Sequence, residues 1–194
     1  IDKMIGDAIV SIFNAPIDQV DHAQRAVETA FLLDKFFTDF VARKKLQGID
    51  MGITRIGINT GVATIGNFGG AQRFDYTVIG DAVNTAARIE SANKYLGTRI
   101  CVSGETMDQC SGLYFRPIAS LVLKGKSLSV NVFEPIAEEV YKSPYIQSYI
   151  DFYKRIENNE ASDVAELIAI QKHLPTDPVI NFHLQRMSAG ENGV

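Results

Sequence analysis

The order in which β-rich runs and amphipathic helices follow one another limits the fold of this chain more than any other feature. Apolar residues recur close to a 3.6-residue period from Asp18 or Asp21 to Gly48, which predicts a long amphipathic helix. The same pattern predicts a second helix over residues 80–97. With the β-rich runs around them, the order is β-β-α-β-β-α-β-α-β-β. This order favours an α+β sandwich, with helices on one face of a mainly antiparallel sheet.

The β-rich runs are short and are bounded by turn-forming residues, as hairpin strands are. A tight turn at Gly6-Asp7 divides the first run, and residues 124–127 form the predicted tip of the last hairpin. We expect antiparallel pairing for the runs between the two long helices. The predicted strands lie within residues 3–13, 51–58, 62–66, 74–79, 99–103, 114–123 and 128–134.

A change of pattern between Pro135 and Pro144 predicts a domain boundary. We expect a first domain over residues 1–137 and a small helical C-terminal tail over residues 138–194. Helical periodicity in the tail is compatible with a single helix-turn-helix repeat. The tail helices are predicted over residues 145–157, 161–174 and 179–187.

Composition excludes several classes of protein. Hydrophobic residues make up 46% of the 194 residues and charged residues 22%, so the chain can bury a core. The net charge of −4 gives no general electrostatic reason to bind nucleic acid or an anionic membrane. Cys101 and Cys110 are too few for a disulfide framework, which favours a cytoplasmic setting. No stretch is long and apolar enough to span a bilayer, so we expect no membrane contact from these residues.

Two segments combine polar residues with special backbone. Asp7 follows Gly6 at a tight turn, where it could meet a metal or hydrogen-bond its own backbone. Asn84 and Arg88 lie four residues apart, so they share one face near the N-terminal end of the second helix. That mixture suits phosphate recognition, and the apolar neighbours of the pair argue against an ordinary solvated face.

Other candidate sites carry weaker signals. The glycine-rich loop at residues 66–70 has neither the GxGxxG nor the GxxxxGK[ST] pattern, and a hairpin loop explains it. Lys124 could present its ammonium to phosphates or be part of an ordinary charged turn. The histidines at 22, 173 and 183 are too widely spaced for a metal cluster, and no nucleophile elbow is present.

Four segments, in this order, resemble the catalytic domain of class III nucleotidyl cyclases. The resemblance covers residues 1–137 and is most specific in the long central segment. It implies the family's ferredoxin-like, palm-like antiparallel-sheet sandwich. The segments are Lys3-Met4-Ile5-Gly6-Asp7, Gly57-Ile58-Asn59-Thr60-Gly61, residues 76–90 (YTVIGDAVNTAARIE) and Leu123-Lys124-Gly125-Lys126.

The resemblance implies a phosphorus–oxygen lyase that converts ATP into 3′,5′-cyclic AMP and pyrophosphate. It implies a homodimer with shared sites and two Mg²⁺ or Mn²⁺ ions per site, which assist attack of the ribose 3′-hydroxyl on the α-phosphate. In this family Asp7 matches a metal-binding carboxylate and Asn84 matches the residue that orients the ribose. Arg88 matches the residue that stabilises the pentavalent phosphate, and Lys124 the one that holds the terminal phosphates.

Base choice falls to Lys3 and Thr77, which match the family's purine-recognising pair. Adenine offers an acceptor at N1 and a donor at its exocyclic amine, so a Lys donor and a Thr hydroxyl acceptor satisfy both. Members that use guanine typically carry Glu where this chain has Lys3. ATP is therefore the expected substrate, although a Thr hydroxyl can either donate or accept.

The family's second metal-binding Asp lies on a strand that would precede Ile1. Asp2 does not substitute for it, because Asp2 falls outside the matching motif. We therefore expect an N-terminally truncated domain, with weak or no turnover by the chain alone. Two alternatives stay open: a guanylate cyclase, and a non-catalytic dimerisation or nucleotide-sensing module of the same fold. Retention of all the matching site residues argues against the module.

Overall fold

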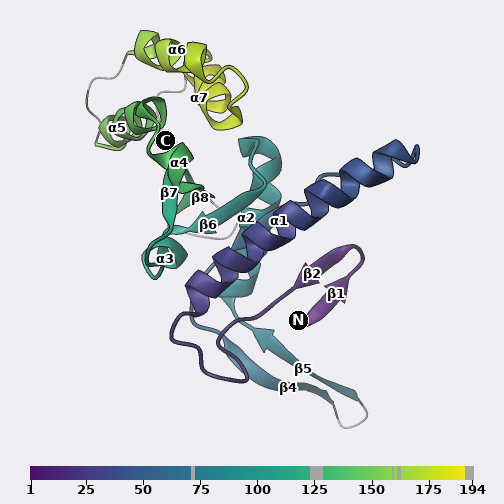
Figure 1. The fold of residues 1–194 in the computed structure, drawn as a ribbon. Coiled ribbons are helices and arrows are strands. Elements are labelled where there is room, and N and C mark those ends of the chain that lie inside the picture. Colours follow the sequence, from purple (N-terminus) through teal and green to yellow (C-terminus); the bar gives the residue numbers. More distant parts are fainter. Residues whose placement is uncertain (71–72, 123–128, 159, 161–162, 191–194) are drawn as a thin grey trace.

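The computed structural model describes residues 1–70, 73–122, 129–158, 160 and 163–190 (Figure 1). Strands and helices alternate over the first two thirds of the chain, and four helices follow. The strands are β1 (Lys3–Ile5), β2 (Ala8–Val10), β3 (Ile56–Ile58), β4 (Thr64–Gly70), β5 (Arg73–Ile79), β6 (Ile100–Ser103), β7 (Tyr114–Leu121) and β8 (Val130–Ile136). The helices are α1 (His22–Leu46), α2 (Asp81–Leu96), α3 (Gly104–Met107), α4 (Glu138–Tyr141), α5 (Pro144–Glu157), α6 (Val164–His173) and α7 (Pro178–Ser188).

The strands form one four-stranded sheet and two separate ribbons. The sheet has the order β3-β6-β8-β7, and the ribbons β1-β2 and β4-β5 extend away from it (Figure 1). Both ribbons are antiparallel, as predicted. The antiparallel prediction is wrong for residues 51–58, because β3 pairs in parallel with β6, Ile56 opposite Ile100. A parallel partner must come from beyond a crossover, and here α2 supplies that crossover.

Helices cover both faces of the four-stranded sheet rather than the one face that the sequence predicted. Alternate residues of a strand point to opposite faces, and β6 is buried on both. Ile100 and Val102 pack in one cluster with Val27 of α1. Cys101, between them, packs in the other cluster with Ile89 of α2. The chain is thus an α+β structure whose central sheet is enclosed between helical layers.

The C-terminal helices share a core with the sheet. Tyr149 and Phe152 of α5 and Ile180 of α7 are almost fully buried in the same cluster as Ile118 of β7. The Tyr149 hydroxyl donates a 2.8 Å hydrogen bond to the carbonyl of Pro117. These buried contacts pack the tail against the sheet. None of the helices in the described part of the chain is long and apolar enough to cross a membrane.

A buried cation joins the tail to the sheet. Arg116 of β7 is 4% exposed, and its Nε donates to Glu134 of β8 at 2.7 Å. Its Nη1 donates to Asp177, whose other carboxylate oxygen caps α7 by accepting from the amides of Val179 and Ile180. Burial raises the pKa of Glu134 even though Arg116 acts against it. Satisfying both carboxylates with one guanidinium keeps this charge cluster tolerable inside the protein.

The buried imidazole of His183 on α7 should make the stability of the fold depend on pH. Burial lowers its pKa to about 4, and its Nε2 lies 2.8 Å from the carbonyl of Ile118. The unfolded chain, with a His pKa near 6.5, binds the extra proton first, so stability present above about pH 6.5 is lost as pH falls towards about 4. The loss is on the order of 3 kcal/mol. We expect His183→Gln, which keeps a donor, to flatten the fall in melting temperature between pH 7.5 and 4.5.

The matched control is His173→Gln, because His173 is exposed and stacks on Tyr145. This variant should retain the wild-type slope of melting temperature against pH. Parallel profiles for wild type and His183→Gln would show that the buried imidazole is not the titrating group.

Candidate active site

Three of the predicted site residues, Thr77, Asn84 and Arg88, lie on β5 and α2, which follow each other directly. Gly80 connects the two elements, and a Cβ there would lie 3.1 Å from the Cα of Ala63. The loop after β3 also holds the start of α2, since Asn59 Nδ2 donates a 3.1 Å hydrogen bond to the carbonyl of Ala82. The first turn of α2 is therefore fixed against the loop of residues 59–63.

The middle of α2 lies unusually close to β3. A Cβ on Gly57 would overlap the backbone of Ala86 and Glu90, so only glycine permits this approach. Asn93 is fully buried and donates from Nδ2 to the carbonyl of Ile56 at 3.1 Å. Its Oδ1 accepts from the Thr98 hydroxyl at 2.8 Å. These contacts set the position of the helix that carries Asn84 and Arg88.

Asn84 and Arg88 lie one turn apart on α2, as predicted. Asn84 is exposed and Arg88 is half-buried. The Nη1 atom of Arg88 is buried and has no hydrogen-bond partner among the residues that the structure describes. A buried guanidinium nitrogen without an acceptor is costly, and an anionic ligand would satisfy it. Arg88 thus has the features of an anion-binding residue.

Lys3 and Thr77, the predicted base-recognising pair, are brought together by Asp2. The Thr77 hydroxyl on β5 donates to Asp2 Oδ2 at 2.9 Å. The ammonium of Lys3 lies 3.4 Å from the same oxygen. The Asp2 side chain is only 2% exposed, whereas that of Lys3 is 42% exposed. One buried carboxylate therefore links the hairpin to β5, next to an exposed Lys3 side chain.

Asp7 lies apart from this pair, at the turn between β1 and β2. Gly6 has φ 63°, and the turn leaves Asp7 exposed. Within the described ranges, no three His, Cys, Asp or Glu side chains gather closely enough to hold a metal. A single exposed carboxylate still suits Mg²⁺ or Mn²⁺, because such ions are often held by one or two carboxylates and the substrate's phosphates. Asp7 offers one carboxylate oxygen ligand of the kind that these ions take, and its predicted role as a metal ligand stays a prediction.

Sequence reasoning predicted residues that would face a ligand but missed residues that support them. Lys124 lies outside the described residues, so its predicted role stays a prediction. Asp2 was set aside as a metal ligand, and its position next to Lys3 gave no signal of the contact with Thr77, 75 residues away. Asn93 had a weak signal, since a polar residue on the apolar side of a helix needs buried partners.

Known proteins share the sequence motifs and the fold of this chain. Residues 3–134 match the family described as the Adenylate and Guanylate cyclase catalytic domain. This chain belongs to that family. "Adenylate cyclase 1" of Rhizobium meliloti is 34% identical to it over 132 residues, 68% of this chain and 20% of that protein. The crystal structure of the adenylyl cyclase CyaB from P. aeruginosa is 33% identical, with a TM-score of 0.64 over 71% of each chain.

A third relative extends the similarity into the tail. "Adenylate cyclase, terminal-differentiation specific" of Dictyostelium discoideum is 34% identical over 200 residues, which cover 96% of this chain. The chain spans only 20% of the Rhizobium protein and 9% of the Dictyostelium protein. The prediction of a class III cyclase fold is confirmed.

The buried hydrogen bonds of Asn93 should contribute to the free energy of unfolding by joining α2 to β3. In Asn93→Ala, the carbonyl of Ile56 and the hydroxyl of Thr98 lose a buried partner and a small cavity opens. We expect the free energy of unfolding to fall by about 2–4 kcal/mol, measured by urea denaturation. Ser91→Ala, at an exposed position of the same helix, should cost less than about 0.5 kcal/mol. Equal effects of the two substitutions would contradict the proposed support role.

Proposed function

We propose that this chain is the catalytic region of an adenylate cyclase, which converts ATP into 3′,5′-cyclic AMP and pyrophosphate. The observation that carries the proposal is Arg88, whose Nη1 is buried and without an acceptor among the described residues. Arg88 lies one helical turn from Asn84 on α2, the helix that follows β5, and β5 carries Thr77. A buried guanidinium nitrogen without an acceptor among the described residues, on the helix that follows the strand of Thr77, is suited to the phosphates of a nucleoside triphosphate.

The roles of the side chains follow from the charge that the reaction develops. Asn84, at an exposed position, hydrogen-bonds the ribose and aligns its 3′-oxygen with the α-phosphate. Arg88 stabilises the negative charge that grows on the pentavalent phosphate. Lys124 binds the terminal phosphates that leave as pyrophosphate. Because Arg88 is held by a helix packed on β3, its charge is already oriented when the substrate binds.

Asp7 would hold the metal ions. Two Mg²⁺ or Mn²⁺ ions, when bound, would lower the pKa of the 3′-hydroxyl and neutralise phosphate charge. Asp7 contributes a hard oxygen ligand from an exposed turn, which suits these ions. We propose a second carboxylate for this site from outside the described residues, as the family resemblance implies.

A homodimer would complete each site. Asp7 lies at the turn of the β1-β2 hairpin and Lys3 near its open end, roughly 10 Å away at the rise of a β-strand. The hairpin also exposes Met4 (71%), Ile5 (61%) and Ile9 (52%). Such a surface favours burial against a second copy. In this arrangement, the metal carboxylate of one protomer serves the nucleotide held by its partner.

Adenine is the base that Lys3 and Thr77 would select. Lys3 has an exposed side chain whose ammonium can donate to N1 of adenine, while the Thr77 hydroxyl accepts from the exocyclic amine. Guanine presents the reverse pattern along this edge. A guanylate cyclase is the second candidate, because the matching family includes both activities. A non-catalytic module is the third.

The decisive assay measures cyclic AMP and cyclic GMP formation with Mg²⁺ or Mn²⁺ by the full-length protein and by residues 1–194. We expect metal-dependent cyclic AMP from the full-length protein. Because we propose that the second metal carboxylate comes from outside the described residues, we expect little product from residues 1–194 alone. Predominant cyclic GMP would replace the adenylate assignment with the guanylate one. A folded dimer that forms neither product would indicate the non-catalytic module.

Arg88→Met tests the proposed electrostatic role. Methionine has a similar length and no charge, so the nascent phosphate charge loses its stabilisation. We expect kcat to fall by about 10²–10³, while circular dichroism shows a retained fold. Arg43→Met, at an exposed position in the last turn of α1, is the matched control and should leave kcat unchanged. Near wild-type turnover by Arg88→Met would contradict the role.

A further inference from the structure

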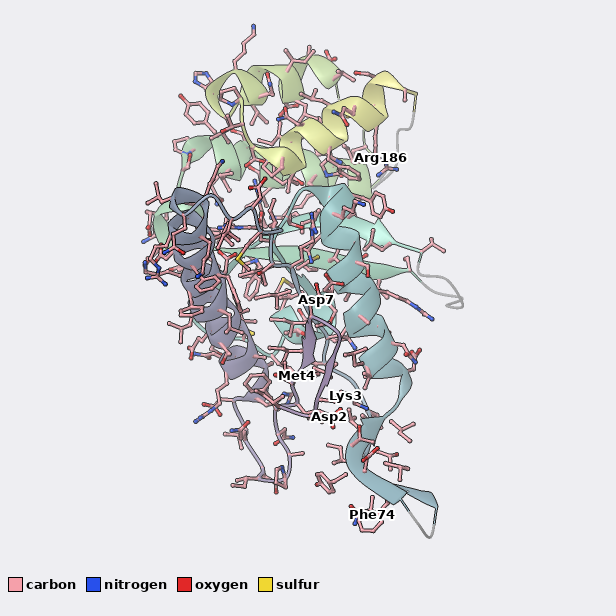
Figure 2. All side chains as sticks on the ribbon, turned by 90° about the vertical axis from the view of Figure 1, so that its right-hand side faces the viewer. Asp2, Lys3, Met4, Asp7, Phe74 and Arg186 are labelled. Atoms are coloured by element: carbon pink, nitrogen blue, oxygen red, sulfur yellow. The ribbon has the colours of Figure 1, made fainter. Side chains whose placement is uncertain are left out.

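Asp2 is the residue whose contacts the proposed function leaves unexplained. Its backbone amide donates a 2.8 Å hydrogen bond to the carbonyl of Val10, which continues the β1-β2 pairing by one residue. Its carboxylate is 2% exposed and faces both Thr77 and Lys3 through a single oxygen. Figure 2 shows Asp2 and Lys3 next to each other at the open end of the hairpin, with Asp7 at the far end.

The chemistry of these groups determines the direction of the hydrogen bond. A hydroxyl carries one hydrogen and two lone pairs, and an ionised carboxylate only accepts. The Thr77 hydroxyl therefore gives its single hydrogen to Asp2 at 2.9 Å. Its lone pairs are all that it can offer to a ligand. A Thr hydroxyl can either donate or accept, and the contact with Asp2 leaves Thr77 only the role of acceptor towards a base.

The same carboxylate acts on the cation. The Lys3 ammonium, 3.4 Å from Asp2 Oδ2, has three hydrogens, so one can face Asp2 while others stay available to a ligand. A ligand therefore meets an acceptor at the Thr77 hydroxyl and a donor at the Lys3 ammonium. A purine with an amino group beside an unprotonated ring nitrogen complements this pair.

We propose that Asp2 is a positioning residue for base selection, which makes Thr77 an acceptor and orients Lys3 as a donor. The proposal rests on the proposed cyclase function and deepens it. Guanine would place its O6, an acceptor, against the Thr77 hydroxyl, whose only hydrogen is donated to Asp2. It would also place its N1–H, a donor, against the Lys3 ammonium. A site built around a directional hydrogen bond rejects the analogue that cannot make it.

Asp2→Asn tests this idea because it keeps the shape of the side chain. The Asn amide can donate to Thr77, which frees the hydroxyl hydrogen for guanine O6. We expect the ratio of kcat/KM for ATP to kcat/KM for GTP in the full-length protein to fall by about tenfold or more. A merely structural role would lower both values together and leave the ratio unchanged, and that outcome would overturn the proposal.

Asp75→Asn is the matched control. Asp75 lies two residues from Thr77 on β5 and is exposed, so the substitution removes an equal charge from the strand that carries Thr77. Its ATP-to-GTP ratio should equal that of wild type. A fall as large as that in Asp2→Asn would assign the effect to general charge and overturn the proposal.

Thr77→Val provides a second variant that leaves Asp2 in place and keeps the proposal testable if Asp2→Asn does not fold. Thr77→Val should lower the ATP-to-GTP ratio. Asp2→Asn should lower this ratio much less in the Thr77→Val background than in the wild-type background. An unchanged ratio in Thr77→Val would overturn the proposal. Calorimetric binding of 3′-deoxy-ATP and 3′-deoxy-GTP, which cannot cyclise, measures the same preference without turnover.

These measurements separate the two ideas. If wild type forms cyclic nucleotide and Asp2→Asn keeps its selectivity, only the role of Asp2 fails. If wild type neither binds the 3′-deoxy nucleotides nor forms product, the proposed function fails and the role of Asp2 fails with it.

Discussion

The close packing of α2 on β3 is the contact on which the rest of the structure depends. Gly57 lets the helix backbone approach the strand, and Asn93 joins the two through its buried amide. On one side of this contact, β3 and β6 begin the central sheet. On the other side, α2 carries Asn84 and Arg88. A single packing interaction therefore supports both the core and the proposed chemistry.

Two buried polar side chains, Arg116 and His183, are satisfied across elements that lie far apart in the sequence. Arg116 of β7 is bonded to Glu134 of β8 and to Asp177 at the start of α7. His183 of the tail meets a carbonyl of β7. An unpaired member of either set would carry the full cost of its desolvation. This requirement gives the helical tail a defined position on the sheet, beyond what apolar packing alone would specify.

The residues proposed to meet the nucleotide were identifiable from the sequence, since each falls within a motif or on a helix face. Arg88 and Asn84 share a face because a helix repeats every 3.6 residues. The residues that orient them were not identifiable in this way. Asp2 meets Thr77 across 75 residues, and Asn93 meets Ile56 across 37. Such contacts depend on tertiary packing, and no local pattern encodes them.

The sequence by itself determined the helices over residues 22–46 and 81–96, the stop at Gly97 and the turn after Gly6, because periodicity and positive φ act locally. It also carried the motifs that define the cyclase family. Only the tertiary structure decided that β3 pairs in parallel with β6 and that helices cover both faces of the sheet. A strand's partner is chosen by contacts made after the intervening helix has packed, so its own residues do not specify that partner.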